Sequence, residues 1–296
     1  MLPEHPPASE RAPEFADTAP MRRSKNQTAA ISEVLALKQR LRTFWNMQQE
    51  YWDMLSSSDS LESPSRQRAA TFLLPGESVL DLACGTAANS AWLGDRCRYF
   101  GVDLSIKALR QQVSPSLRLA CGDADNLPFR SESFDAALAT YVLEHAVEPI
   151  KTLEEMCRVV RPGGRIVLLG PAWDFPFWFP NSLRSKSGSL WWRLRYSLGR
   201  FWRQMMGWWF GRLPFDRVTD PDAFNSKFVH DADAVYIVWT YEVVRLMKRS
   251  GHRLLHWEVD DQMLGTSPLV RSFKRFLTRM PIYRYSGSTV LLVFEK

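Results

Sequence analysis

The sequence predicts a doubly wound α/β fold, in which helices cover both faces of a mostly parallel sheet. Between residues 78 and 170, short continuous apolar runs alternate with segments of helical character. Strands that are apolar throughout are buried on both faces, as in a parallel sheet between helices. Small-residue turns and acidic residues follow several of these runs. Open parallel sheets bind ligands at the carboxyl ends of their strands, so these turns predict a binding site there.

Each element of the core is placed by its pattern. Five strands are expected at residues 78–82, 98–102, 117–121, 134–140 and 165–170, with helices at 86–94, 105–112 and 147–160 between them. An amphipathic helical segment from Ala29 to about Leu55 and a short helix around 64–73 precede the first strand. After Pro171 the alternation pauses. It resumes near Asp231 with a helix to about Ser250, a strand near 252–260 and a last strand near 289–294.

This reading divides the chain into five parts. They are a disordered tail (1–28), an N-terminal helical cap (29–74), a core (75–172), an insertion (173–230) and a C-terminal completion of the core (231–296).

Composition excludes several classes of protein. The tail is rich in Pro, Glu, Ala and Ser and has no apolar stretch, so it is not a secretory signal. No apolar run approaches the roughly 20 residues that span a bilayer. The four cysteines, Cys84, Cys97, Cys121 and Cys157, form no Cys-x-x-Cys pair, so no metal site is expected and they are interpreted as small core residues. We expect a cytoplasmic protein, free or attached to the inner face of the membrane.

The positive charge of the chain is local. The net charge is +6, yet residues 181–217 hold eight basic residues and one acidic residue. Residues 173–215 also contain seven of the twelve tryptophans. A basic and aromatic segment in an otherwise balanced chain indicates a local partner.

The stretch 79–93 is the most specific signal. A buried strand leads into a turn of small residues and then into the start of a helix, a combination that lets the backbone approach a ligand and offers unpaired N–H groups to it. Further motifs follow in order: Gly-Val-Asp at 101–103, Gly-Asp-Ala-Asp at 122–125, Phe-Asp-Ala at 134–136, Tyr-Val-Leu-Glu-His at 141–145 and Arg-Pro-Gly-Gly at 161–164. In this order they resemble class I S-adenosylmethionine-dependent methyltransferases. The resemblance covers roughly residues 75–171 and is to the methyltransferase type 11 group, which includes the ubiquinone and menaquinone biosynthesis methyltransferases.

The resemblance implies a Rossmann-like, mostly parallel sheet of seven strands with a final antiparallel strand, an N-terminal helical cap and a long insertion after strand five. It also implies S-adenosyl-L-methionine as cofactor. Ala83 to Thr86 would form the turn under the methionine portion, Gly85 would mark the closest approach, and Asp81 would organise this turn and the amino group of the ligand. Ala83 and Ala87 stand where relatives often have glycine. The Gly-x-Gly-x-x-Gly fingerprint of nicotinamide enzymes is absent.

The remaining cofactor residues follow the next strands. By the same resemblance, Asp103 would accept the ribose hydroxyls, and Thr140 would lie at the cofactor. Asp123 with Ala124 would clamp the adenine, against which Leu104 would pack. Both aspartates have an alternative as loop acids that cap helices.

The helical cap offers two aromatic candidates. Tyr51 or Trp52 would cover the cofactor or, equally well, pack in the core.

The chemistry of methyl transfer asks little of the protein. The sulfonium is already an electrophile, so the protein mainly aligns the reacting atoms, and a base is needed only if the acceptor must lose a proton early. The candidate bases and pocket residues are Tyr141, Glu144, His145 and His230, each with a structural alternative. The Asn-Pro-Pro-Tyr motif of DNA amino-group methylation is absent from residues 140–143, so nucleic acid is disfavoured as acceptor.

The insertion contains a strongly amphipathic helix at 190–212. On a helical wheel the apolar arc holds Trp191, Leu194, Leu198, Phe201, Trp202, Met205 and Trp209, and the opposite side holds Arg193, Ser197, Arg200, Gln204 and Gly211. Trp and Arg in this pattern are typical of a helix in a membrane interface, and residues 269–280 repeat the chemistry. The alternatives are a lid whose aromatic face packs on the core, and an oligomer interface. A nucleic acid partner would make poor use of so continuous an apolar arc.

These observations predict an S-adenosylmethionine-dependent methyltransferase that acts on a hydrophobic, lipid-linked or membrane-associated small molecule. One alternative is a methyltransferase of a soluble metabolite, with the insertion as lid. Another is a non-catalytic peripheral membrane or scaffolding protein that retains the fold.

Overall fold

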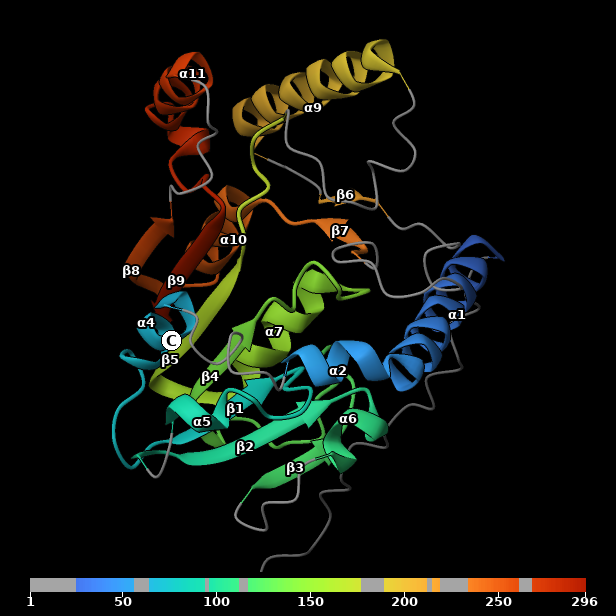
Figure 1. Ribbon diagram of the computed structural model, residues 1–296, viewed down its shortest axis with the longest axis vertical. Coiled ribbons are helices and arrows are strands. Elements are labelled where there is room, and N and C mark those ends of the chain that lie inside the picture. Colours follow the sequence, from blue (N-terminus) through green and yellow to red (C-terminus); the bar gives the residue numbers. More distant parts are fainter. Residues whose placement is uncertain are drawn as a thin grey trace, which may run out of the picture.

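A seven-stranded sheet forms the centre of the computed structural model, which describes residues 25–55, 64–93, 96–111, 117–176, 189–211, 215–218, 234–260 and 268–296 (Figure 1). Its strand order is β3-β2-β1-β4-β5-β9-β8. The strands are β1 (Ser78–Leu82), β2 (Arg98–Asp103), β3 (Arg118–Cys121), β4 (Phe134–Thr140), β5 (Val160–Pro171), β8 (Arg253–Asp260) and β9 (Thr289–Glu295). Strands β1 to β5 pair in parallel, and β9 is antiparallel to both β5 and β8. The predicted Rossmann-like fold is confirmed.

Both faces of the sheet are buried, as its apolar strands require. Leu80 of β1 belongs to a core shared with α7 (Pro149–Val159) and α10 (Thr240–Arg249). Val79, one residue earlier, belongs to a second core shared with α4 (Pro64–Ala70) and α5 (Ser90–Leu93). Successive side chains of a strand point to opposite faces, so neighbours in sequence fill different layers.

The strand order reverses between β1 and β4, which opens a crevice at the carboxyl ends of these strands. Helices α1 (Lys25–Met47) and α2 (Gln49–Leu55) of the cap lie beside this end, next to α6 (Ile106–Arg110) (Figure 1). Leu37 and Leu41 of α1 pack with Val235 in a small separate core. The cap is therefore held at the site by apolar contacts.

Four predictions about individual elements need correction. The helix expected at 86–94 begins only at Ser90, because Ala87 within this range has a φ of 54°, which no α-helix allows. The helix expected at 29–55 starts at Lys25 and is divided at Gln48.

The other two corrections concern the beginning of the C-terminal part and one cysteine. Residues 236–237 form a strand, β7 (Tyr236–Ile237), which pairs with β6 (Asp216–Arg217), so the expected helix from 231 begins at Thr240. Cys121 is exposed rather than in the core, because β3 is an edge strand.

Helix α9 (Leu190–Phe210) lies beyond β6 and β7, beside α11 (Pro268–Thr278), at the top of Figure 1. Phe201 and Met205 of α9 pack with Leu277 of α11 in one small core. Neither helix, nor any other among the described residues, is long and apolar enough to cross a membrane.

The orientation of α9 is the largest departure from expectation. Its buried residues are Ser197, Arg200, Gln204 and Gly207. Arg200 was expected at the solvent or the lipid headgroups, and this prediction is wrong, because its guanidinium is fully buried. The polar side of the helix faces the protein, and most of the predicted apolar arc is exposed.

Candidate active site

A cavity of about 480 Å³ lies at the carboxyl ends of β1, β2 and β4, under α1 and α2. Most of the predicted site residues line it: Tyr51, Ala83, Gly85, Asp103, Leu104, Asp123, Ala124, Thr140, Tyr141, Glu144 and His145. Asp81 and Thr86 are buried without belonging to the lining. His230 lies outside the described residues.

The turn after β1 brings backbone to the cavity in a strained conformation. Ala83, Gly85 and Ala87 have φ angles of 48°, 55° and 54°. The left-handed region costs a non-glycine residue roughly 1–2 kcal/mol, and such strain concentrates at functional sites. The Cys84 N–H donates to the Val102 carbonyl at 3.0 Å, which ties the turn to β2.

Asp103 is fixed by two backbone donors. The Gly85 N–H donates to one carboxylate oxygen at 2.8 Å and the Ser105 N–H to the other at 2.7 Å. Burial raises the pKa of Asp103 to about 6, against the effect of these two hydrogen bonds. Each oxygen keeps a second lone pair, so the carboxylate can also accept from two hydroxyl groups of a ligand.

Asp81 does not line the cavity but is bonded to Asn89, which does. The sequence analysis missed Asn89. The Asn89 side-chain N–H₂ donates to both oxygens of Asp81 at 3.0 Å and to Thr140 Oγ1 at 3.0 Å. Tyr99 donates its hydroxyl to Asp81 at 2.5 Å, and burial raises the pKa of Asp81 to about 7. Asn89 Oδ1 is buried in the cavity wall without a hydrogen-bond partner among the described residues. Such an acceptor fits an ammonium group.

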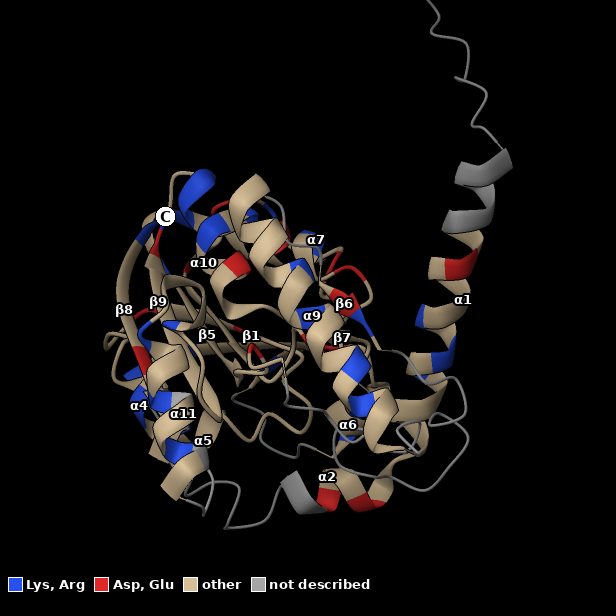
Figure 2. Cartoon of the chain, turned by 90° about the horizontal axis from the view of Figure 1, so that it is seen from above, with Lys and Arg blue, Asp and Glu red and all other residues tan. Residues whose placement is uncertain are grey.

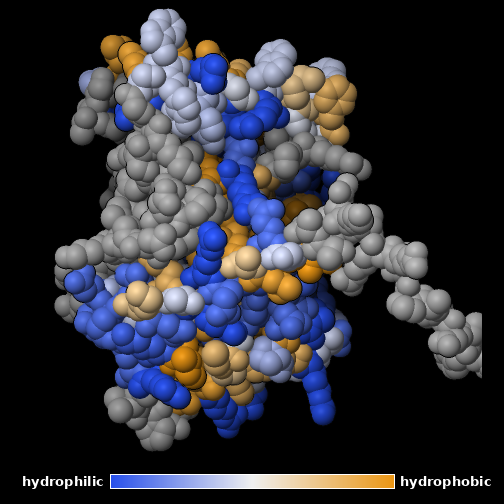
Figure 3. Space-filling view, turned by 90° about the vertical axis from the view of Figure 1, so that its right-hand side faces the viewer, coloured by the Kyte–Doolittle hydropathy of each residue, from blue (hydrophilic) through white to orange (hydrophobic). Residues whose placement is uncertain are grey.

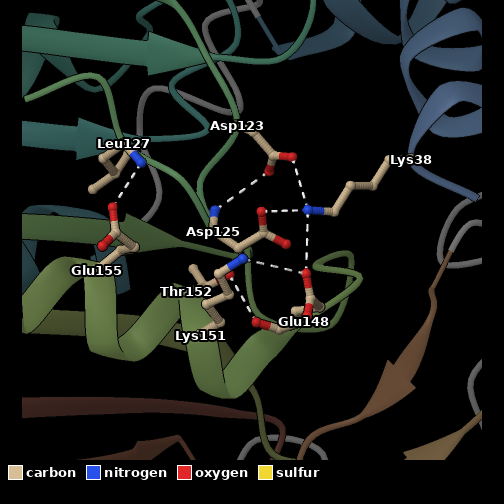
Figure 4. Close-up of polar contacts among 8 residues, drawn as sticks. All are labelled: Lys38, Asp123, Asp125, Leu127, Glu148, Lys151, Thr152 and Glu155. Atoms are coloured by element: carbon tan, nitrogen blue, oxygen red, sulfur yellow. Dashed lines mark hydrogen bonds and ion pairs between the residues drawn. The ribbon is translucent and has the colours of Figure 1, made fainter. Parts of the chain in front are cut away.

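Lys38 of α1 is a second missed residue, and it lies beside the expected adenine position (Figure 4). Its Nζ is 3.1 Å from Asp123 Oδ2, 2.5 Å from Asp125 Oδ1 and 3.3 Å from Glu148 Oε2. Burial raises the pKa of Asp125 to about 6. Burial also opposes ionisation of Asp123, but hydrogen bonds from Asp125 and Lys38 lower the pKa of Asp123. One cation thus joins the cap to the loop after β3 and to the start of α7.

The sequence contained a signal for Lys38. It lies four residues after Val34 and seven before Trp45, on the stripe that faces the core. A lysine on an apolar stripe needs an acidic partner, and three acidic side chains lie around this one.

Aromatic rings form another part of the wall. Trp45 lies 4.8 Å from Tyr51 and 5.9 Å from His145 between ring centroids. Trp52 lies against the same two cap aromatics, and Trp173 also lines the cavity. Because the rings are contiguous, this part of the cavity suits a flat or apolar ligand group.

Arg66 of α4 completes the wall and was also missed. Its guanidinium carbon lies 5.3 Å from the Trp92 ring centroid and 5.7 Å from that of Tyr141. Tyr141 itself has a φ of 58°, a further strained position at the cavity. A stacked guanidinium at a cavity wall is well placed to bind a carboxylate.

The candidate proton acceptors lie together. His145 Nε2 is 4.0 Å from Glu144 Oε1, and both residues line the cavity. Tyr141 shares a hydrogen bond of 3.3 Å with Thr289 Oγ1. The described residues contain no cluster of three or more His, Cys, Asp or Glu side chains that could hold a metal ion.

Comparison with known proteins identifies the class. Residues 80–168 match the methyltransferase domain family. A Bacillus halodurans protein described as a putative methyltransferase matches 79% of the chain and 99% of its own, at a TM-score of 0.50 and 14% identity. A protein of Thermotoga maritima described as an S-adenosylmethionine-dependent methyltransferase, possibly a histamine N-methyltransferase, matches 88% of this chain and 99% of its own, at 0.50 and 18%. Residues 80–168 therefore form a methyltransferase domain, and the sheet that contains them has the fold of class I S-adenosylmethionine-dependent methyltransferases.

Curated relatives match the same part of the chain. A demethylmenaquinone methyltransferase of Paenarthrobacter aurescens is 43% identical over 31% of the chain and 38% of its own length. An uncharacterized protein in transposon TN4556 of Streptomyces fradiae is 35% identical over 42% of the chain and 39% of its own. The chain thus matches less than half the length of these relatives.

Proposed function

We propose that the protein transfers the methyl group of S-adenosyl-L-methionine to a hydrophobic, membrane-associated small molecule. The observation that carries the proposal is the convergence, on one cavity, of the strained turn 83–87, Asp103, Asp123 and an aromatic wall. The domain family matched by residues 80–168 gives the reaction type.

The wall offers a partner for each polar part of the cofactor. Asp103 would accept the ribose hydroxyls, and Asp123 would accept the adenine amino group. Asn89 Oδ1 would accept from the ammonium group, and Arg66 would bind the carboxylate. The bound cofactor supplies an electrophilic methyl group, so the protein needs only to orient the acceptor and exclude water.

The acceptor would lie against Trp45, Tyr51 and Trp173, close to Glu144 and His145. The relatives named as demethylmenaquinone methyltransferases support an acceptor with a flat ring, because a ring of that kind stacks on aromatic side chains. Glu144 and His145 could take the proton that such an acceptor loses.

Calorimetric titration with S-adenosylhomocysteine tests the cofactor half of the proposal. We expect saturable binding to the wild-type protein and weaker binding to Asp103→Ala. A well-folded wild-type protein that gives no binding heat across several temperatures, and no thermal stabilisation by the ligand, would contradict the proposal and favour a non-catalytic scaffold.

Methyl transfer from radiolabelled cofactor tests the acceptor half. The assay compares a short-chain demethylnaphthoquinone in detergent with a pool of water-soluble metabolites. Label in the organic phase supports a hydrophobic acceptor, and label confined to the aqueous phase supports the soluble-metabolite alternative.

A further inference from the structure

We infer that α9 and α11 form one docking face for an anionic membrane surface. The feature that carries the inference is the reversed amphipathicity of α9, whose polar side is buried and whose tryptophan side is exposed. The idea that the membrane presents the acceptor rests on the proposed function. The docking face itself is inferred from the two helices alone.

The buried side of α9 is attached to the protein by polar contacts. Arg200 donates to the Trp173 carbonyl at 2.5 Å, and Gln204 donates to the Asp174 carbonyl at 2.9 Å. The Tyr283 hydroxyl donates to Gln204 Oε1 at 2.5 Å. These contacts fix the rotation of the helix, so the tryptophan side is directed outward by the fold.

The exposed side of α9 carries large apolar side chains along its whole length. Trp191 is 80% exposed, Trp202 65% and Trp209 77%. On α11, Leu269 is 83% exposed and Phe273 51%. Figure 3 shows orange, hydrophobic side chains interspersed with pale and blue ones at the upper end of the molecule, where α9 and α11 lie in Figure 1. Large exposed apolar patches mark interaction sites.

Charge selects the partner. The sequences of α9 and α11 contain no acidic residue, and Figure 2 shows basic positions on both helices. The side chains of Arg193, Arg195, Arg271 and Arg275 are exposed. A second copy of this face would bring like charges together, whereas anionic headgroups would neutralise them. Tryptophan and arginine together are also the residues favoured at a membrane interface.

The docking face is joined to the active-site cavity by Trp173. Its carbonyl accepts from Arg200 under α9, and the residue is also part of the cavity wall. A molecule dissolved in the membrane would therefore be presented near the wall against which we place the acceptor.

Flotation of the full-length protein with vesicles tests the inference. The probes are vesicles of phosphatidylcholine alone and vesicles that contain 30% phosphatidylglycerol, at low and high salt. We expect the wild-type protein to float with the anionic vesicles at low salt. A variant that combines four substitutions should partition onto the anionic vesicles at least about tenfold more weakly: Arg193→Gln, Arg195→Gln, Arg271→Gln and Arg275→Gln. Each basic residue near the surface contributes roughly fivefold.

Substitutions of the apolar face separate the two contributions. Trp202→Ser, Trp209→Ser and Phe273→Ser together should lower partitioning onto both kinds of vesicle, because apolar burial does not depend on lipid charge. Two controls should behave as wild type: Leu74→Ser with Ile150→Ser, which are exposed apolar residues elsewhere, and Arg110→Gln with Arg130→Gln, which are exposed basic residues elsewhere.

Titration with S-adenosylhomocysteine, run on the same preparations, separates this inference from the proposed function. Wild-type protein that binds the ligand yet stays wholly in the supernatant at low salt would overturn the docking face and leave the proposed function intact. Wild-type protein that floats with the vesicles but does not bind the ligand would support the docking face and contradict the proposed function. A stable dimer in light scattering that the tryptophan substitutions convert to monomer, or retention on a single-stranded oligonucleotide that they abolish, would assign the face to another partner and overturn the inference.

Discussion

The cavity wall and the underside of α9 both bury polar side chains, but they use them differently. Asp103 and Asn89 line a cavity and keep acceptor capacity toward it. Arg200 and Gln204 instead bond to backbone carbonyls of the segment beneath the helix, and neither lines the cavity. A buried polar group therefore indicates binding only where it adjoins space for a ligand. Elsewhere it fixes the orientation of an element.

The difference predicts opposite losses in the two regions. Substitutions in the cavity wall should reduce cofactor affinity by more than any loss of stability explains, whereas substitutions under α9 should reduce stability and leave cofactor affinity unchanged. A wall variant that binds normally, or a variant under α9 that binds the cofactor more weakly, would break the comparison.

The largest effect is expected from Gly85→Val, which should abolish binding of S-adenosylhomocysteine. Gly85 has a φ of 55°, and a branched side chain would both strain this turn and fill the space beside the ligand. Gly76→Val is the matched control, because Gly76 has a φ of 82° and open space around the position of a Cβ. The control should melt early and still bind. Calorimetry that finds normal binding by Gly85→Val would refute the close approach.

Arg200→Leu should lower the free energy of unfolding by about 3 kcal/mol, near the lower end for a buried ion pair that loses one partner. The substitution leaves the Trp173 carbonyl without this donor and removes one of the two arginines that pair with Asp216, whose other partner is Arg203. Arg195→Leu, on the exposed side of the same helix, should change stability by less than about 0.5 kcal/mol. Denaturant unfolding measures both. A mild loss in Arg200→Leu would mean that α9 is attached mainly by its apolar contacts.

These two regions also differ in how far the sequence predicted them. The cofactor side of the site could be predicted because each of its signals is local. A small-residue turn or an acid directly follows the strand to which it belongs. Asp103, Gly85 and Asp123 were placed at the site because these local motifs resemble those of the methyltransferase family, and all three line the cavity.

The rest could not be predicted, because it depends on contacts across the chain. A helical wheel gives two faces of α9 but does not say which one is inward, and the usual rule that apolar residues face the core fails there. Arg66 reaches the cavity through tertiary packing. Asn89 lies within residues 79–93, but no motif in the sequence marks it as a residue of the site. The end of the turn could not be read from the sequence either. Ala83 and Ala87 have positive φ angles, but alanine is a common helix residue and gives no sign of this conformation.

A smaller effect than those above is expected from Asp103→Ala. A hydrogen bond to a charged group is worth about 1.5–3 kcal/mol, so affinity for S-adenosylhomocysteine should fall by roughly tenfold or more. Asp53→Ala, an exposed acid on α2, should bind as wild type. Equal affinities of the two variants in calorimetry would remove the ribose assignment.

Lys38→Met should weaken cofactor affinity by about fivefold, which corresponds to roughly 1 kcal/mol for a partly exposed ion pair. The length of the side chain is kept, but the bridge from α1 to Asp123 and Asp125 is lost. Hydrogen exchange of α1 should become faster, and bound ligand should restore less of its protection than in the wild type. Lys107→Met is the control on α6. Unchanged exchange in α1 would mean that apolar contacts alone hold the cap.

The dependence on pH sharpens the comparison, because the two regions should respond with opposite signs. Asp103 must be ionised to accept the ribose hydroxyls, and burial raises its pKa to about 6, so affinity for S-adenosylhomocysteine should fall as pH drops through about 6.

Burial raises the pKa of Asp174, beneath α9, to about 7 from an ordinary 3.8. The folded state then holds a proton that the unfolded state releases, so the stability contributed by Asp174 is complete below about pH 4 and is lost as pH rises through about 7, by at most about 1.4 kcal/mol for each pH unit. Asp174→Asn should make the loss of stability between pH 4 and 7 less steep, leaving the part that comes from Asp81 and Asp103, without changing the pH dependence of cofactor affinity. Denaturant unfolding and calorimetry across that range measure the two responses. A single variant that flattened both would mean that the regions are coupled rather than separate.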